Sequence, residues 1–220
     1  MAKLTREAIV AEAVSLADHG GLDAVSMRRI ADALGAGVMS LYRHVPDKDT
    51  LLVEMATAVG RDFTYPDARL GDPDWRGRVR LAAEVDLELY LRHPWVLLAH
   101  AAPRVSASEP SVRCFDWLVE ALVHLTGDVP AAADCALQVW SLIPGIAIGA
   151  VGAELLAPGS GGESGFLAGL CDNEFAARLP RMAELGARTE LGEPRALLAR
   201  AIDALCDGFV SRAGPRQDRA

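Results

Sequence analysis

The stretch from Val25 to Leu52 constrains the fold more than any other part of the chain, because its spacing fits two short helices joined by a tight turn. Ser26 can cap the first helix by accepting a hydrogen bond from a backbone N–H one turn further on. Gly35 sits where a helix end often needs a left-handed residue, and Gly37 offers a second permissive position. Apolar residues at helical spacing predict one shared core: Ile30, Ala31, Leu34, Leu41 and Val45.

The close spacing of Ala31, Gly35 and Leu41 lets these two helices cross at a steep angle. A helix-turn-helix has this requirement, since its second helix projects and can enter a DNA major groove. An ordinary helical hairpin is the alternative. The second helix has no acid between Val38 and Pro46, which favours contact with phosphates. Its outward positions are predicted to be Val38, Met39, Ser40 and Arg43.

Together these residues resemble the DNA-binding head of the tetracycline-repressor (TetR) family. The match covers Thr5 to Leu52, and the rest of the chain resembles the family in helical architecture and length. Two short motifs of the body resemble those of the tetracycline-repressor subgroup: the helix start at Asp74-Trp75 and the turn at Arg92-His93-Pro94. The resemblance implies an all-α fold, with an N-terminal three-helix helix-turn-helix head and a larger helical-bundle body for ligand binding and dimerisation. The motif consists of Ile30-Ala31, Leu34-Gly35, Leu41-Tyr42, His44, Lys48 and Leu51-Leu52.

The resemblance and the side-chain chemistry assign the same roles in DNA binding. Arg28 and Arg43 can reach guanine edges, while Met39 and Ser40 can touch bases or a thymine methyl. The predicted phosphate contacts are Ser26, Tyr42, His44 and Lys48. The DNA-binding set also includes Met27 and Val38, and Met27 and Met39 are unusual at a polar face.

Charge is distributed unevenly along the chain. The net charge of the 220 residues is −8, which argues against a protein that coats nucleic acid nonspecifically. From Ser26 to Lys48, however, four bases and two acids give +2. We therefore expect a small basic face on an acidic body.

Most of the remaining chain reads as helix, and hydrophobic residues make up 51% of it, enough for a full core. Division is expected into residues 1–64 (the head with a linking helix), 65–213 (the body) and 214–220 (a flexible tail). A glycine-rich surface loop is expected over 157–165. The predicted helices are Thr5–His19, Asp47–Phe63, Trp75–Arg92, a short apolar piece Trp95–Ala102, Glu109–Gly127, Ala131–Leu156, Asn173–Arg188 and Pro194–Arg212, the last with an apolar stripe at Ala196, Leu197, Ala201, Ile202, Leu205 and Phe209.

The stretch from Cys135 to Ala153 has 19 residues without a charge, which approaches the length of a membrane span. Its flanks, Asp134 and Glu154, are acidic, whereas spanning helices usually have basic flanks. We therefore expect a buried bundle helix and no membrane contact. Its glycines suit a dimer interface or, alternatively, a tight crossing within one chain.

Tryptophans spread over the body favour a pocket for a small, largely apolar effector, although core packing would use the same residues. His100 matches by position a histidine that binds the drug-chelated metal in tetracycline repressors, but Pro103 stands where that site needs a hydroxyl. No metal or cofactor is therefore expected, and His100 is predicted as a hydrogen-bond donor. The predicted ligand-binding residues are Asp86, Tyr90, His100, Trp117, Trp140 and Ile143.

Two other classes of function fit the sequence less well. An enzyme would need a nucleophile, base or metal set, and no H-x-x-x-H or G-x-S-x-G motif occurs. The four cysteines are far apart, which favours reduced core thiols over a metal site or a sensor thiol. The N-terminus lacks an apolar signal segment. We predict a cytoplasmic homodimer that places its second helices in successive major grooves of a palindromic operator, roughly 34 Å apart, and that represses transcription until a small effector releases it.

Overall fold

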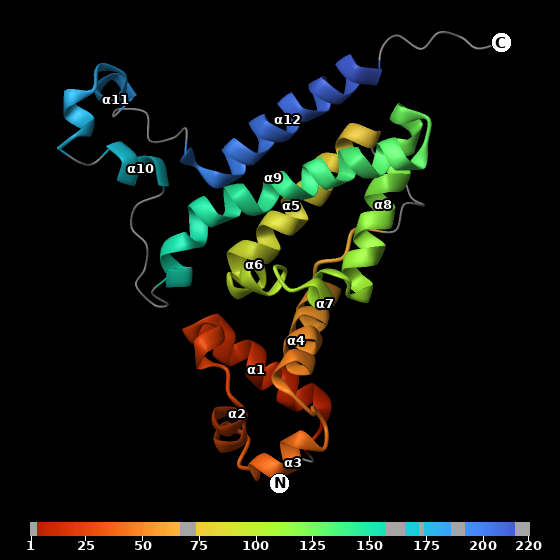
Figure 1. The fold of residues 1–220 in the computed structure, drawn as a ribbon, viewed down its shortest axis with the longest axis vertical. Coiled ribbons are helices and arrows are strands. Elements are labelled where there is room, and N and C mark those ends of the chain that lie inside the picture. Colours follow the sequence, from red (N-terminus) through yellow and green to blue (C-terminus); the bar gives the residue numbers. More distant parts are fainter. Residues whose placement is uncertain (1–3, 67–73, 157–165, 172–173, 186–191, 214–220) are drawn as a thin grey trace. The chain divides into compact units, whose positions relative to one another are not determined.

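The computed structural model describes residues 4–66, 74–156, 166–171, 174–185 and 192–213. Regular structure in these ranges is helical throughout, which confirms the predicted all-α class (Figure 1). The chain forms two compact units. The first contains Met1–Thr64, Glu88–Cys114 and Ala153–Gly161, and the second contains Tyr65–Leu87, Phe115–Gly152 and Gly162–Ala220. Each is described by itself below.

The N-terminal part of the first unit contains α1 (Arg6–Gly20), a short 3-10 helix (Leu22–Ala24), α2 (Met27–Ala33), α3 (Val38–Tyr42) and α4 (Lys48–Asp62). We call residues 5–62 the head. Three side chains cap its helices by accepting a backbone N–H. Thr5 caps α1 at 3.2 Å, Ser26 caps α2 at 3.2 Å and Asp47 caps α4 at 2.6 Å. The predicted caps at Ser26 and Asp47 are therefore confirmed, and they set where the helices begin.

The turn between α2 and α3 uses only one of its two glycines for an unusual backbone. Gly35 has φ +61°, a left-handed conformation that other residues adopt at a cost, as predicted. Gly37 has φ −77° and ψ 137°, so the expectation of a second permissive position is wrong. Gly37 precedes α3 in ordinary extended backbone, which needs no glycine.

The head closes around a small apolar core. The predicted core residues Ile30, Ala31, Leu41 and Val45 are at most 1% exposed, whereas Leu34, also predicted for this core, is only partly buried. Ile9 of α1 joins them with no exposed surface. An ion pair of 3.2 Å between Arg6 and Glu54 also links α1 to α4. Because the core fixes Leu41 inward, the other faces of α3 are free to point outward.

The remaining helices agree closely with the predicted long segments. The short apolar piece Trp95–Ala102 contains one helix, Trp95–Ala99, and a further short helix that was not predicted begins at Pro103. The observed helices are α5 (Trp75–Arg92), α6 (Trp95–Ala99), α7 (Pro103–Ser106), α8 (Glu109–Thr126), α9 (Val129–Leu156), α10 (Phe166–Cys171), a 3-10 helix (Ala176–Arg178), α11 (Pro180–Leu185) and α12 (Pro194–Ala213).

One predicted helix, Asn173–Arg188, is wrong. A 3-10 helix and α11 replace it, and they meet at Leu179 and Pro180. Leu179 has φ −103° and ψ 114°, the extended conformation that a following proline favours. The proline therefore stops one helix and starts the next. Two further predictions, the loop over 157–165 and the tail over 214–220, lie outside the described residues.

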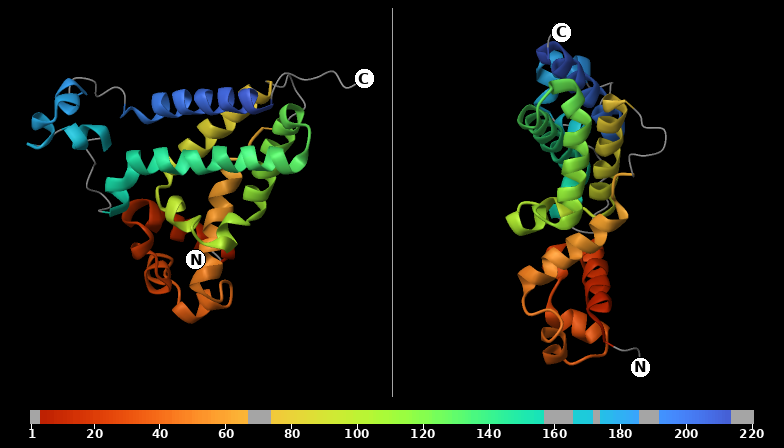
Figure 2. Two further views of the ribbon diagram at one scale, coloured as in Figure 1. Left: turned by 45° about the horizontal axis from the view of Figure 1, so that its top comes forward. Right: turned by 90° about the vertical axis from the view of Figure 1, so that its right-hand side faces the viewer.

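Helices α9 and α12 run side by side in the second unit (Figure 2). The prediction of a buried bundle helix holds for one face of α9, where Ala136, Val139 and Ile143 are at most 1% exposed. The other face is open, with Leu137 and Ile148 each 54% exposed. By length and composition, α9 is the one described helix long and apolar enough to cross a membrane, a property that core helices share.

The apolar stripe of α12 lies about one residue further along than predicted. Its buried residues are Leu198, Ile202, Cys206 and Phe209. Leu197 is 37% exposed. Residues 197 and 198 are both apolar, so the sequence alone fits either register. In the structure Leu198 packs inward together with Cys206, which is not part of the predicted stripe.

Candidate DNA interface and effector site

A hollow of about 520 Å³ opens in the head between α2, α3 and the start of α4. Six of the predicted DNA-binding residues line it, and the polar ones among them come from three helices and their caps: Ser26, Arg28, Tyr42 and Lys48. Met27 and Val38 also contribute to its wall. The fold thus brings together residues that lie up to 22 positions apart in the sequence.

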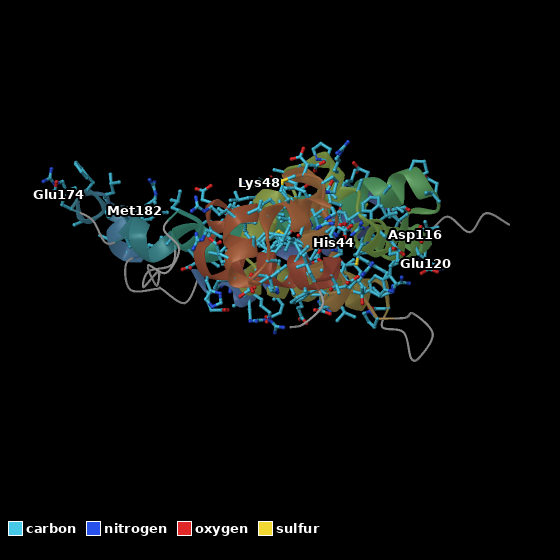
Figure 3. All side chains as sticks on the ribbon, turned by 90° about the horizontal axis from the view of Figure 1, so that it is seen from below. His44, Lys48, Asp116, Glu120, Glu174 and Met182 are labelled. Carbon is cyan, nitrogen blue, oxygen red and sulfur yellow. The ribbon has the colours of Figure 1, made fainter. Side chains whose placement is uncertain are left out.

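Each of these side chains is positioned by a helix start or end. Ser26 and Arg28 lie at the capped start of α2, where backbone N–H groups carry a partial positive charge. Tyr42 closes α3 and is 42% exposed. Lys48 opens α4 directly after the Asp47 cap, and both Lys48 and His44 can be followed in Figure 3. Helix starts combined with cations suit a bound anion.

Helix α3 exposes the side chains predicted to face DNA bases. Met39 is 76% exposed, while Leu41 on the opposite side has no exposed surface. The Arg43 guanidinium donates a 3.1 Å hydrogen bond to the Ser40 hydroxyl. This bond links two of the predicted base-reading polar groups and holds Arg43 along the helix surface.

Asp47 is the acid in the wall of the hollow. Its carboxylate accepts the Thr50 backbone N–H, and this hydrogen bond lowers the pKa of Asp47. The charge is therefore retained and directed into the start of α4. The positive charge of Lys48, the next residue, offsets the negative charge of Asp47.

In the second unit, three of the predicted ligand-binding residues gather around Tyr65. The Tyr65 hydroxyl donates to Asp86 Oδ2 at 2.8 Å and accepts from Trp140 Nε1 at 3.2 Å. The Trp117 ring lies 5.1 Å from the Tyr65 ring, between centroids. Phe115 packs on Trp140 at 5.0 Å. We call Tyr65, Asp86, Trp117 and Trp140 the Tyr65 cluster.

Two groups in the Tyr65 cluster are electrostatically unusual. Burial raises the pKa of Asp86 to about 7, although the hydrogen bond from Tyr65 opposes this shift. The Trp117 indole N–H is buried and has no hydrogen-bond partner. Arg78 stacks its guanidinium over the Trp117 ring at 4.0 Å and pairs with Glu120 at 2.9 Å. A buried donor without an acceptor is costly, which makes it a place where a ligand acceptor would be favoured.

The other predicted ligand-binding residues are Tyr90, His100 and Ile143. Tyr90 and His100 pair with each other in the first unit, with 3.1 Å between the hydroxyl and Nδ1. Burial lowers the pKa of His100, which favours its neutral form. Ile143 is 1% exposed within the buried face of α9.

Sequence reasoning missed Tyr65, the centre of the cluster. It lies at the start of a stretch rich in proline and glycine, a composition typical of a connector. An aromatic residue that is 8% exposed beside such a stretch is a packing signal, but burial is visible only in the structure.

The described residues contain no group of three or more His, Cys, Asp or Glu side chains able to hold a metal ion. The cysteines are free thiols, and Cys114, Cys135 and Cys206 are buried. Burial raises the pKa of Cys206 to about 11, so this thiol stays protonated and unreactive near neutral pH.

Comparison with known proteins gives matches at two levels. Residues 9–55 match the family model of bacterial regulatory proteins of the tetR family. The transcriptional repressor DrrR1 of Streptomyces coeruleorubidus is 49% identical over 94 residues, 43% of this chain and 34% of DrrR1. The class C tetracycline repressor of Escherichia coli is 36% identical over 77 residues, 34% of this chain and 35% of that repressor. These matches span about a third of each relative's length.

A solved structure extends the likeness to nearly the whole chain. The Streptomyces coelicolor TetR family protein ActR, in complex with actinorhodin, superimposes with a TM-score of 0.75 at 25% identity. The alignment covers 97% of this chain and 100% of ActR. The N-terminal part of the chain is thus similar to bacterial regulatory proteins of the tetR family, and the fold of the whole chain is similar to that of a solved TetR family protein.

Proposed function

We propose that this protein is a DNA-binding transcriptional repressor that a small molecule releases from its operator. The observation that carries the proposal is the head hollow, where Ser26, Arg28, Tyr42 and Lys48 converge beside the exposed face of α3. Cations and helix starts bind phosphates, and the side chains of α3 read base edges. Curated relatives with a similar head are named as transcriptional repressors.

Within this function, the predicted residues divide into two kinds of contact. Arg28 and Arg43 contact guanine edges, and Met39 and Ser40 contact bases or a thymine methyl. Before Arg43 can reach a base, it must leave its hydrogen bond with Ser40, and DNA contacts compensate for that loss. Phosphate contacts come from Ser26, Tyr42, His44 and Lys48.

The proposed function is tested by titrating the protein against the DNA upstream of its own gene and against a scrambled duplex of the same length. We expect saturable binding of the upstream fragment at nanomolar protein and a steep loss of affinity with added salt. Equal affinity for both duplexes would contradict sequence-specific regulation.

We further propose that the protein is a homodimer that pairs through α9 and α12. A groove of about 640 Å³ between these helices is lined mainly by apolar residues, including Leu137, Leu142 and Leu205. Leu137 is 54% and Val210 43% exposed, so the chain alone leaves apolar surface uncovered. A second copy of the same face would bury it, and two copies suit a palindromic operator.

Dimerisation is tested by light scattering after size-exclusion chromatography of Leu137→Glu, with Val112→Glu as the control. Val112 is 56% exposed on α8 and is not part of the groove. Leu137→Glu should shift the mass toward a monomer, whereas Val112→Glu should keep the wild-type mass. Identical masses for both variants would exclude this interface.

The proposed effector is small, largely apolar and aromatic, with a hydrogen-bond acceptor for Trp117. The rings of the Tyr65 cluster offer stacking surface, and the unpaired Trp117 N–H offers a donor. ActR was solved with actinorhodin, which makes that compound a reasonable first probe. Quenching of tryptophan fluorescence by actinorhodin, weakened in Trp117→Phe, is the expected result. The same quenching in both proteins would place the ligand elsewhere.

We also propose that the chain divides into a head with its linking helix over 1–64, a body over 65–213 and a tail. The proposed location of the protein is the cytoplasm. The similarity of residues 9–55 to the tetR family model supports this proposal, and so do the free thiols, which suit a reducing compartment.

A further inference from the structure

Asp18 occupies an unfavourable position in the head unless something compensates for it. It lies in the last turn of α1, which ends at Gly20. The carbonyl end of a helix carries partial negative charge and disfavours a carboxylate. The Asp18 side chain is also only 26% exposed, so water solvates it incompletely. The residues around it must therefore supply the compensation.

Two donors distant in the sequence supply it. His93 Nδ1 lies 2.7 Å from Asp18 Oδ1, and Trp95 Nε1 lies 2.7 Å from the same oxygen. Since a carboxylate only accepts, both nitrogens donate. These bonds span 75 and 77 residues of sequence. Trp95 is 1% exposed, so loss of its acceptor would leave a buried donor unpaired.

His93 and Trp95 flank the corner between α5 and α6. This corner is tight, because the His93 N–H bonds to Leu89 in α5 and the Val96 N–H bonds back to His93, both at 2.9 Å. The His93 ring also meets the edge of Phe63, at the end of α4, with 5.9 Å between centroids. One carboxylate oxygen thus ties α1 to a corner that also contacts the end of α4.

We propose that Asp18 is a positioning residue that couples the α5–α6 corner to the DNA-binding helices. Movement of the corner acts on α1, and α1 is packed against α2 and α4 around a core that does not deform freely. Helix α5 leads into the corner and also carries Asp86 of the Tyr65 cluster. Asp18 therefore fixes how the two heads of a dimer are presented to an operator. The inference rests on the proposed function.

The test compares the full-length wild type with Asp18→Ala and Asp18→Asn on two duplexes from the footprinted upstream site, one with both half-sites and one with a single half-site. Asp18→Ala should lose affinity for the full site by about tenfold, within the usual range of coupling between sites. Its affinity for the single half-site should match the wild type, because the base and phosphate contacts are intact. Asp23→Ala, an exposed carboxylate of the same head, should bind both duplexes normally.

Asp18→Asn is the rescue variant. Both donors use the same oxygen, and an asparagine carbonyl keeps that acceptor, so its full-site affinity should remain near the wild type. Trp95→Phe, which keeps the ring and removes one donor, provides a second and milder variant with a smaller full-site loss. Unchanged full-site binding by Asp18→Ala and Trp95→Phe, or equal losses on both duplexes, would overturn the positioning role. The wild-type titration tests the proposed function separately.

Discussion

The head and the Tyr65 cluster use polar side chains in opposite ways. In the head, the predicted DNA-binding groups are exposed around a hollow and their caps fix the backbone, so they are available to an outside partner. In the Tyr65 cluster, Asp86 and Trp140 bond inward to a tyrosine that is 8% exposed. The head therefore presents its polar groups to water and, under the proposed function, to DNA, whereas the cluster excludes water.

This contrast explains why the two regions respond to different changes. A charge on the head surface is screened by solvent and acts mainly through DNA. A charge inside the cluster is poorly solvated, so its protonation alters the stability of the fold. Substitutions in the two regions should therefore differ in whether they change stability or DNA binding.

Leu41→Ala should destabilise the head by about 2–5 kcal/mol, because a fully buried leucine leaves a cavity. Specific DNA binding should be lost at temperatures where the head melts. Circular dichroism melting combined with a DNA titration measures both effects. Met39→Ala, at a 76% exposed position two residues earlier, is the control and should melt like the wild type. Equal melting of the two variants would contradict the assignment of inner and outer faces to α3.

Asp86 should make the unfolding free energy depend on pH. Its folded pKa of about 7 lies above the ordinary value of 3.8, so the folded state holds the proton more tightly. The contribution of Asp86 to stability is therefore full below pH 4 and lost as the pH rises to 7, at up to about 1.4 kcal/mol per pH unit. Urea unfolding of Asp86→Asn should show a smaller decline over this window than the wild type.

The control for Asp86→Asn is Asp203→Asn, which removes a half-exposed carboxylate paired with Arg80 on the surface. The pH dependence of its unfolding free energy between 4 and 7 should resemble that of the wild type. If Asp86→Asn and the wild type also gave parallel curves, Asp86 would be solvated like a surface group and the contrast between the regions would fail.

Arg28→Ala and Lys48→Ala should separate base reading from phosphate binding. Arg28→Ala should cost about 1–3 kcal/mol of operator binding and relax the sequence preference. Lys48→Ala should weaken all duplexes alike and reduce the salt slope by about 1. Binding isotherms at several salt concentrations on specific and scrambled DNA measure both. Equal effects from both substitutions would refute the division of roles.

Ser26→Ala should cost about 1 kcal/mol of head stability, because α2 loses the side chain that accepts the Arg29 N–H. Ser26→Asp keeps an acceptor and should restore the melting temperature. The same aspartate should weaken DNA binding, since a carboxylate then faces the phosphates. A stable Ser26→Asp with normal DNA affinity would remove Ser26 from the interface.

Local chemistry made the head predictable from the sequence. The caps at Ser26 and Asp47, the left-handed Gly35 and the inward Leu41 each depend on neighbours within a few residues. Tyr65 and Asp18 depend on contacts across 21 to 77 residues, which no local pattern records. Pro180 is a local signal for the helix break, yet the apolar residues on both sides of it also fit a single helix, which is why the prediction of one helix over 173–188 is wrong.

The central claim is that the acid-free face of α3 enters the major groove of a palindromic operator. Dimethyl sulfate protection of guanine N7 on the bound upstream fragment tests it most directly, because that atom lies in the major groove. We expect two protected patches whose centres are about one helical turn apart, both lost in Arg28→Ala at the same protein concentration. Tight binding without guanine protection, or protection unchanged in Arg28→Ala, would contradict the account.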